Sequence, residues 1–256
     1  MSPSFNLFND FNGFNFACMK AFILAAGLGT RLRSLGLDVP KVMVPIAGRP
    51  LLEHHIVLLR EQGIRELIVN LHYLPEKITG HFGDGSKFGV HITYSHEPEL
   101  LGTAGAVKKM EHLLRDGTFI VLYGDNLIRV EFAPLVEFHR TRRALATVAL
   151  FESPEPWTGG VVETEVDGRV RRFVEKPDPK EVSTNLINAG IYVLESQVLD
   201  AIPAGQFCDF GRDVFPKLLA AGKAVYAMKP KAYVQDVGTP ERLAKAQRDF
   251  EKGLAQ

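Results

Sequence analysis

The sequence predicts an α/β fold in which a mostly parallel central sheet is flanked by helices and carries a small antiparallel addition. Strand-like and helical segments alternate through the first half of the chain, which is the order expected of a parallel sheet with helices on both faces. In the second half, strand-like segments follow one another closely, which favours antiparallel pairing. Because there is no internal repeat and no linker rich in Pro, Gly or Ser, we expect one compact domain.

The elements of the first half are predicted from short apolar runs and from apolar residues at helical spacing. Their order is strand 20–25, helix 50–62, strand 66–71, helix 75–82, strand 90–95, helix 103–114 and strand 118–123. The last of these strands is apolar nearly throughout, as expected of a strand that is covered on both faces.

The second half is predicted to contain strands at 144–151, 160–165, 169–175 and 188–194. Asp167-Gly168 supplies a hairpin turn, because this dipeptide tolerates the positive φ angles of a tight turn. Two helices, at 211–221 and 239–252, frame a last strand pair within 224–236.

Composition and net charge indicate which partners and which compartment to expect. The chain has 30 basic and 30 acidic residues, so no overall charge draws it to nucleic acid or to a membrane surface, and we expect neither as a partner. No apolar run reaches the length of a membrane span. Cys18 and Cys208 are the only cysteines, which suits a reducing compartment. The eight histidines show no metal-ligand spacing. We therefore expect a cytoplasmic protein.

Residues 1–18 repeat Phe and Asn and lack the basic start and apolar core of a secretory signal. We predict a disordered or loosely docked extension, followed by a single domain over 19–256, with Met19 as an alternative functional start. A second interpretation is that the phenylalanines dock on a partner or a second subunit.

The most informative segment is 24–50, where a strand ends at Ala26 and gives way to Gly27-Leu28-Gly29-Thr30-Arg31. Glycines there let backbone N–H groups approach a phosphate, and arginine supplies a fork suited to its oxygens. The G-x-G-x-x-G pattern of dinucleotide sites is absent, because Leu32 stands at the third glycine, and so is the P-loop pattern. A tight turn without ligand explains one glycine but not the whole segment.

This segment resembles the signature of the sugar-1-phosphate nucleotidylyltransferases, in particular the GDP-mannose pyrophosphorylase-like members. The resemblance is carried by G-L-G-T-R-L-R, then V-P-K, then G-R-P-L-L-E-H-H-I, and it extends over most of 19–252. Ser34, Gly36 and Val42 depart from the usual pattern. The resemblance implies a Rossmann-like nucleotide-diphospho-sugar transferase fold, with nucleotide contacts at Ala26, Gly27, Gly29 and Thr30 and a catalytic role for Arg31.

Two aspartates follow strand-like segments in motifs where the family carries metal-binding aspartates. Asp125 lies in L-Y-G-D-N, and Asp236 lies in Q-D-V-G-T-P. The resemblance implies that both bind Mg²⁺, which prefers one or two carboxylates together with phosphate oxygens and waters. The alternatives are an N-cap-like role for Asp236 and a plain turn for Asp125.

Two lysines next to prolines are candidates for phosphate binding. The resemblance implies that Lys41 contacts the nucleotide phosphates, while Lys176 in V-E-K-P holds the sugar phosphate. Glu175, Gly160 and Asn188 match family positions around the sugar hydroxyls. The alternatives are surface lysines, a bulge glycine at Gly160 and a turn residue at Asn188.

The segment E-P-E-L-L-G-T-A-G-A, from Glu97, resembles the base-binding loop of the family, with Gly102 and Thr103 at the nucleotide. A carboxylate is acceptor-only and matches the N1–H and amino group of guanine, so Glu97 favours GTP. The alternative is a surface Glu97, with the base read by backbone groups.

The function implied is transfer of a nucleotidyl group from a nucleoside triphosphate to a sugar 1-phosphate, with release of pyrophosphate. We expect a mannose-1-phosphate guanylyltransferase or a heptose equivalent. The alternatives are a glucose-1-phosphate thymidylyl-, uridylyl- or cytidylyltransferase, a non-catalytic regulatory subunit and a nicotinamide-binding dehydrogenase. Because the chain ends soon after Glu251, we expect no β-helical or acyltransferase tail. The resemblance also implies a homodimer or homotetramer.

Overall fold

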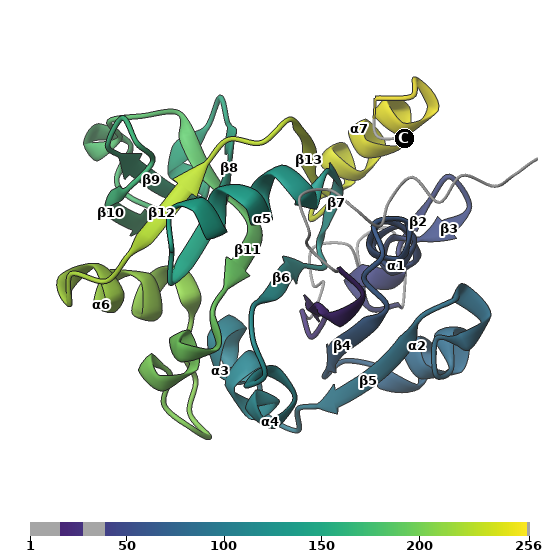
Figure 1. The fold of residues 1–256 in the computed structure, drawn as a ribbon. Coiled ribbons are helices and arrows are strands. Elements are labelled where there is room, and N and C mark those ends of the chain that lie inside the picture. Colours follow the sequence, from purple (N-terminus) through teal and green to yellow (C-terminus); the bar gives the residue numbers. More distant parts are fainter. Residues whose placement is uncertain (1–15, 28–38, 255–256) are drawn as a thin grey trace, which may run out of the picture.

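The computed structural model describes residues 16–27 and 39–254, and within them it confirms the predicted α/β fold (Figure 1). The strands are β1 Lys20–Leu24, β2 Pro45–Ile46, β3 Arg49–Pro50, β4 Glu66–Leu71, β5 His91–His96, β6 Phe119–Tyr123, β7 Asn126–Val130, β8 Ala146–Glu152, β9 Gly160–Thr164, β10 Val170–Glu175, β11 Leu186–Leu194, β12 Val225–Met228 and β13 Ala232–Asp236.

The α-helices of the same residues are α1 Leu51–Glu61, α2 Pro75–Phe82, α3 Gly102–Lys109, α4 Glu111–Leu114, α5 Phe132–Thr141, α6 Phe215–Ala220 and α7 Pro240–Glu251. A 3₁₀ turn covers Lys41–Met43, and a π-helical turn, Phe210–Val214, runs directly into α6. None of the helices in 16–27 and 39–254 is long and apolar enough to cross a membrane.

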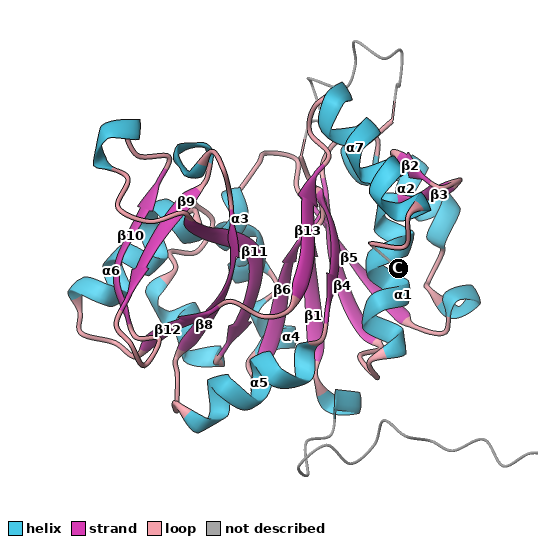
Figure 2. Cartoon of the chain, turned by 90° about the horizontal axis from the view of Figure 1, so that it is seen from above, coloured by secondary structure: helices cyan, strands magenta, loops and turns pink. Residues whose placement is uncertain are grey.

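Nine of the described strands form one sheet, in the order β10-β9-β11-β6-β1-β4-β5, with β8 on β11 and β12 on β8. The strands β6, β1, β4 and β5 are parallel, whereas β11 is antiparallel to β6, β8 and β9. Figure 2 shows this succession, from β10 and β9 at one end to β4 and β5 at the other. The antiparallel addition is thus an extension of the sheet beyond β6.

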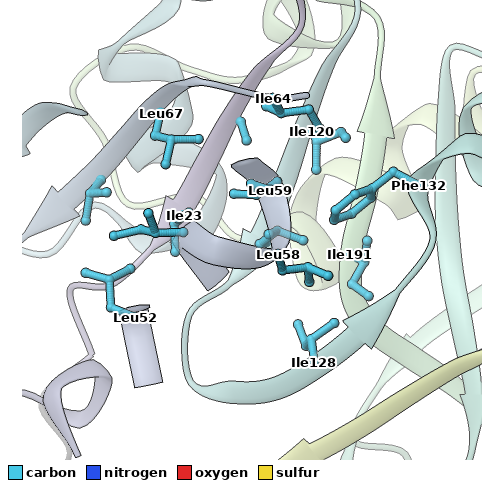
Figure 3. Close-up of a cluster of buried hydrophobic side chains, with 14 of the residues drawn as sticks. Ile23, Leu52, Leu58, Leu59, Ile64, Leu67, Ile120, Ile128, Phe132 and Ile191 are labelled. Carbon is cyan, nitrogen blue, oxygen red and sulfur yellow. The ribbon is translucent and has the colours of Figure 1, made fainter. Parts of the chain in front are cut away.

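Both faces of the parallel strands are buried, because alternate residues enter different hydrophobic clusters. In β1, Ala21 and Ile23 pack with helices α1, α2 and α5, whereas Phe22 packs with α3, α4 and α6. Figure 3 shows the first of these clusters, in which Ile23 and Ile120 of the sheet meet Leu58 and Leu59 of α1. Burial on both faces explains why these strands read as nearly continuous apolar runs.

A third hydrophobic cluster fastens the C-terminal segment to the N-terminal half. Leu243 and Ala246 of α7 pack with Val237 and with residues that precede or begin α1, namely Val44, Ile46 and Leu51. Strand β13 pairs with β7, which begins directly after Asp125. In Figure 1, β13 accordingly lies beside β7, although the two strands are far apart in the sequence.

The structure corrects several predicted elements. The last strand pair does not exist as a pair, because β12 joins β8 while β13 joins β7. Strand β7 and helix α5 were not predicted. The predicted helix 103–114 is interrupted at Met110 between α3 and α4, and the helix predicted at 211–221 begins as a π-helical turn.

Candidate active site

The candidate site lies at the edge of the sheet where the parallel strands end. Gly27 follows β1, Glu97 follows β5, and Asp125 follows β6. Ligands of open α/β sheets bind in the crevice beyond these carboxyl ends. A cavity of about 240 Å³ occupies this edge. Its lining includes the predicted residues Ala26, Gly27, Lys41, Glu97, Gly102, Thr103 and Asp125.

At one end of this cavity a buried lysine joins the two predicted metal-binding aspartates. The Nζ atom of Lys41 lies 2.8 Å from Oδ2 of Asp125 and 3.0 Å from Oδ1 of Asp236. The side chain of Lys41 is only 9% exposed, whereas that of Asp125 is 44% exposed. The antiparallel pairing of β7 with β13 brings the aspartates together, because Asn126 faces Asp236 in the register.

The carboxylate of Asp236 is held ionised by its surroundings. Burial acts to raise its pKa, but the charge and hydrogen bond of Lys41 and further bonds from Arg242 and the Gly238 N–H outweigh burial and lower the pKa. Arg242 donates to Oδ2 at 2.5 Å, and Gly238 donates to Oδ1 at 2.8 Å. A Cβ at Gly238 would lie 2.9 Å from both Nζ of Lys41 and Oδ1 of Asp236, so a larger residue there would displace these two side chains.

The donor set of this end fits a magnesium ion. Two carboxylates converge on one cationic point, which Lys41 Nζ occupies, and Mg²⁺ takes one or two carboxylates when phosphate oxygens and waters complete its shell. No cluster of three or more His, Cys, Asp or Glu side chains arranged for a metal exists in the described part of the chain. Substrate phosphates would therefore have to supply the other ligands.

At the other end of the cavity, Glu97 is 1% exposed and its carboxylate is anchored by protein groups. Asn70 donates to Oε1 at 2.8 Å, and the backbone N–H of Leu101 donates to Oε2 at 3.0 Å. Asn70 in turn accepts a bond from the N–H of Ala25. Each carboxylate oxygen keeps a further lone pair, so a buried acceptor with fixed orientation stands in this part of the cavity.

The glycines of the L-G-T-A-G segment have a structural cause in the described fold. Gly102 has φ +73°, and a Cβ there would lie 2.5 Å from the carbonyl oxygen of Cys208. That oxygen accepts bonds from the N–H groups of Ala104 and Gly105 at the start of α3. Gly102 thus admits the 206–208 backbone against α3, while Thr103 donates to Asp209 at 2.9 Å.

On the sugar side, Glu175 lies in a cradle between two glycines. A Cβ at Gly160 would lie 2.7 Å from its Oε2 atom, and a Cβ at Gly211 would lie 2.9 Å from it. Burial and the nearby charge of Asp209 raise the pKa of Glu175. Lys176 is exposed and has φ +51°, with its N–H bonded to the carbonyl of Gly159.

Asn188 belongs to a polar chain that runs back toward the cavity. Its Nδ2 donates to the hydroxyl of Tyr192 at 2.7 Å, and its Oδ1 accepts from the N–H of Gly190. The hydroxyl of Tyr192 donates to that of Tyr123, which lines the cavity. These two bonds orient the amide of Asn188 and leave one N–H hydrogen and one lone pair of its oxygen for a further partner.

The structure brings together Lys41, Asp125 and Asp236 directly, and it places Ala26, Gly27, Glu97, Gly102 and Thr103 on the same cavity. Gly160, Glu175 and Asn188 lie on the antiparallel side of the sheet, with Lys176 directly after β10. Gly29, Thr30 and Arg31 lie outside the described residues.

Sequence reasoning missed four residues that the geometry adds, namely Asn70, Asp209, Gly238 and Arg242. Gly238 and Arg242 stand two and six residues after Asp236, so the Q-D-V-G-T-P motif gave a local signal for the glycine. Asn70 and Asp209 reach the cavity only through the tertiary fold, and no pattern around them indicates a site.

Comparison with known proteins gives a consistent family. The profile of the family described as "Nucleotidyl transferase" matches residues 20–253. A UTP–glucose-1-phosphate uridylyltransferase from Synechocystis sp. is 40% identical over 233 residues, which are 86% of this chain and 60% of the relative. A mannose-1-phosphate guanylyltransferase from Mycobacterium tuberculosis is 39% identical over 238 residues, which are 93% of this chain and 66% of the relative.

A solved structure, that of HddC from Yersinia pseudotuberculosis, matches with a TM-score of 0.78 at 30% identity and covers 91% of this chain and 99% of its own. The same protein complexed with GMP-PN matches with a TM-score of 0.77. The chain spans 60 to 66% of the length of the two curated relatives named above. Because the family profile covers almost all of the chain, the chain belongs to the nucleotidyl transferase family.

Proposed function

We propose that this protein transfers a nucleotidyl group from a nucleoside triphosphate to a sugar 1-phosphate and releases pyrophosphate. The observation that carries the proposal is the convergence of Asp125 and Asp236 on the buried Lys41, at the end of a cavity that also holds Gly27 and Glu97. The two relatives compared above have names that describe this type of reaction.

In this reaction a phosphate oxygen of the sugar 1-phosphate attacks the α-phosphorus of the triphosphate. A new P–O bond forms, the bond from the α-phosphorus to the bridging oxygen breaks, and pyrophosphate leaves with the electron pair. Both substrates are anions, so catalysis is mostly positioning and neutralisation of charge. Lys41 supplies a buried positive charge at the triphosphate, and the family resemblance assigns a second one to Arg31, which lies outside the described residues.

We propose Mg²⁺ as the cofactor, held by Asp125 and Asp236. When bound, it would neutralise charge on the triphosphate. Arg242 and the Gly238 N–H orient the carboxylate of Asp236, and both bonds already exist in the described fold. Such outer partners fix the direction in which a metal-binding carboxylate points.

For the base, GTP is the preferred donor. Glu97 offers a buried acceptor whose direction is fixed by Asn70 and by the Leu101 N–H, and guanine presents N1–H and an amino group to such an acceptor. The similar structure of HddC complexed with GMP-PN and the guanylyltransferase relative support this choice. The uridylyltransferase relative keeps UTP as the alternative.

For the acceptor, mannose 1-phosphate is the preferred substrate. Lys176 would hold the sugar phosphate, and Glu175 with Gly160 and Asn188 would face the hydroxyls. Burial and the charge of Asp209 raise the pKa of Glu175, and its carboxyl oxygens would accept hydrogen bonds from the sugar hydroxyls. Glucose 1-phosphate and a heptose 1-phosphate are the alternatives.

The remaining features of the proposal concern the whole protein. We propose one catalytic domain over 19–256, acting as a homodimer or homotetramer in the cytoplasm on small molecules alone. The family profile over 20–253 supports the single domain, and the equal numbers of basic and acidic residues support the absence of a nucleic-acid partner. Sedimentation of the purified protein would give the oligomeric state.

The test is pyrophosphate release by purified protein with Mg²⁺, with four nucleoside triphosphates crossed with mannose, glucose and heptose 1-phosphates. GTP with mannose 1-phosphate should give the strongest signal. A signal only with UTP, dTTP or CTP would keep the reaction and overturn the assignment of the base. Silence of folded protein in every combination would overturn the reaction and favour a regulatory subunit.

A further inference from the structure

Two exposed apolar side chains stand on the rim of the cavity. Among the described residues, five large hydrophobic side chains are exposed, and two of them, Leu100 at 38% and Phe207 at 63%, line this one cavity. An exposed phenylalanine ring loses the free energy that burial would give it. Its place beside a polar cavity therefore points to a ligand that covers it.

The backbone that presents Phe207 is fixed. The next residue, Cys208, donates its N–H to the carbonyl of Leu101 at 2.9 Å, and its own carbonyl accepts two bonds from the start of α3. A Cβ at Gly105 would lie 2.6 Å from the carbonyl oxygen of Gln206, so this segment is pressed against the helix. The backbone of 206–208, which carries the ring of Phe207, is thus held in place against the L-G-T-A-G segment.

The chemistry of the cavity changes from end to end. Lys41 and Asp125 make a charged end, next to which Asp236 contacts Lys41, whereas the other end combines the buried polar pair Glu97 and Asn70 with the apolar rim. A ligand that matches both ends has phosphates at one end and, at the other, a flat group with a polar edge and apolar faces. A nucleobase has this character, because its hydrogen-bonding groups lie in the ring plane and its faces stack on aromatic rings.

We propose that Phe207 and Leu100 cover the faces of the base, and that Phe207 determines the preference for purine over pyrimidine triphosphates. The ring stacks on the base while Glu97 reads its edge. A purine presents two fused rings to Phe207 and a pyrimidine only one, so the stacking contact stabilises purine complexes more. This inference rests on the proposed function, since it assigns the base end of the same site.

The test is the dissociation constant by isothermal titration calorimetry for GTP, UTP and inorganic tripolyphosphate. The variants are Phe207→Ala, Phe207→Leu and Phe207→Tyr, with Val166→Ala as the matched control, because Val166 is fully exposed in a turn and does not line the cavity. Phe207→Ala should weaken GTP binding by roughly 5- to 30-fold, within the range of base–aromatic stacking. UTP should lose less, and tripolyphosphate, which has no base, should bind as before.

Phe207→Tyr should stay within about twofold of the parent for GTP, and Phe207→Leu should fall between Tyr and Ala, because it keeps apolar area but not a flat ring. Equal GTP affinity of the parent and Phe207→Ala would overturn the inference while leaving the proposed function intact. Equal losses for GTP and tripolyphosphate would also overturn it, because they would indicate a general distortion. Failure of the parent to bind any nucleotide would remove the proposed function itself.

Discussion

Lys41 is the lysine that joins the two aspartates of the candidate site. Most lysines are exposed, yet this side chain is 9% exposed and contacts two carboxylates. One carboxylate would be enough to neutralise the charge of a lysine with a purely structural role. The second carboxylate makes Lys41 part of a charged group in which Arg242, bonded to Asp236, balances the remaining negative charge. When the triphosphate and Mg²⁺ bind, Lys41 would face phosphate oxygens as well as carboxylates.

Asp125→Asn and Asp236→Asn should each lower turnover by at least about 100-fold, because each removes a charge from the site that holds the metal. Circular dichroism should stay near that of the parent, whereas the unfolding midpoint of Asp236→Asn should fall, because the buried Lys41 and Arg242 lose a charged partner. The matched control is Asp116→Asn, whose side chain is 83% exposed and which should keep full activity. If either site variant kept near-normal rates, the metal assignment of that residue would be wrong.

His55 should make the protein less stable in mild acid. Burial lowers its pKa to about 4, against a bond to the carbonyl of Asn126, and its Nδ1 has no partner within the described residues. Between pH 6.5 and 4 the unfolded chain therefore binds the extra proton, so the free energy of unfolding falls as the pH falls. The loss from pH 7 to 5.5 should be about 1 kcal/mol from this residue.

Urea unfolding at the two pH values measures this effect. His55→Leu should be less stable at pH 7, because the Asn126 carbonyl loses its donor, and its stability should depend less on pH. His112→Gln, at an exposed position, is the control and should keep the pH dependence of the parent. A His55→Leu variant with the parent's pH dependence would contradict the buried, neutral histidine.

At the scale of elements, the parallel half could be predicted well and the C-terminal half less well. Strand β4 and helix α2 have the predicted bounds, because burial on both faces and glycine stops give a strong local signal. Strand β7 was missed because it follows β6 after only two residues, and its partner β13 lies far along the chain. Pairing of distant segments leaves no local pattern, so neither β7 nor the partner of β12 could be found from sequence.

The close packing of the 206–208 backbone against α3 can be tested by a substitution of Gly102. Gly102→Ala should lower the free energy of unfolding by about 2 to 4 kcal/mol, because it adds a Cβ 2.5 Å from the Cys208 carbonyl to the cost of a positive φ. Gly205→Ala is the matched control, since it has φ +68° and open space around its Cβ, and it should lose only about 1 kcal/mol. Equal losses in the two variants, measured by urea unfolding, would show that the close approach does not matter.

At the scale of the whole molecule, the site is assembled from residues that lie far apart in the sequence. Lys41 precedes α1, Asp125 follows β6, and Asp236 ends β13, which is fastened by the packing of α7. Sequence motifs identified all three residues as candidates. The contacts between them could not be predicted from the sequence. Asn70 and Asp209 remained hidden because their side chains act through partners that only the fold supplies.

Ligand binding should therefore stabilise the whole domain. With GTP and Mg²⁺ at 100 times the dissociation constant, the free energy of unfolding should rise by about 2.7 kcal/mol, which raises the melting temperature by several degrees. Removal of Mg²⁺ with EDTA should reduce this shift, since Asp125 and Asp236 would then repel the triphosphate. A melting temperature that GTP does not change, with or without Mg²⁺, would contradict a nucleotide site in this cavity.

The most direct measurement of the central claim is the fate of labelled phosphate when the protein turns over GTP with mannose 1-phosphate and Mg²⁺. With label at the α-phosphate, the account predicts radioactivity in the nucleotide sugar. With label at the γ-phosphate, it predicts radioactivity in pyrophosphate and none in the sugar product. Transfer of the γ-label to the sugar, or release of the α-label only as a free nucleotide, would contradict nucleotidyl transfer.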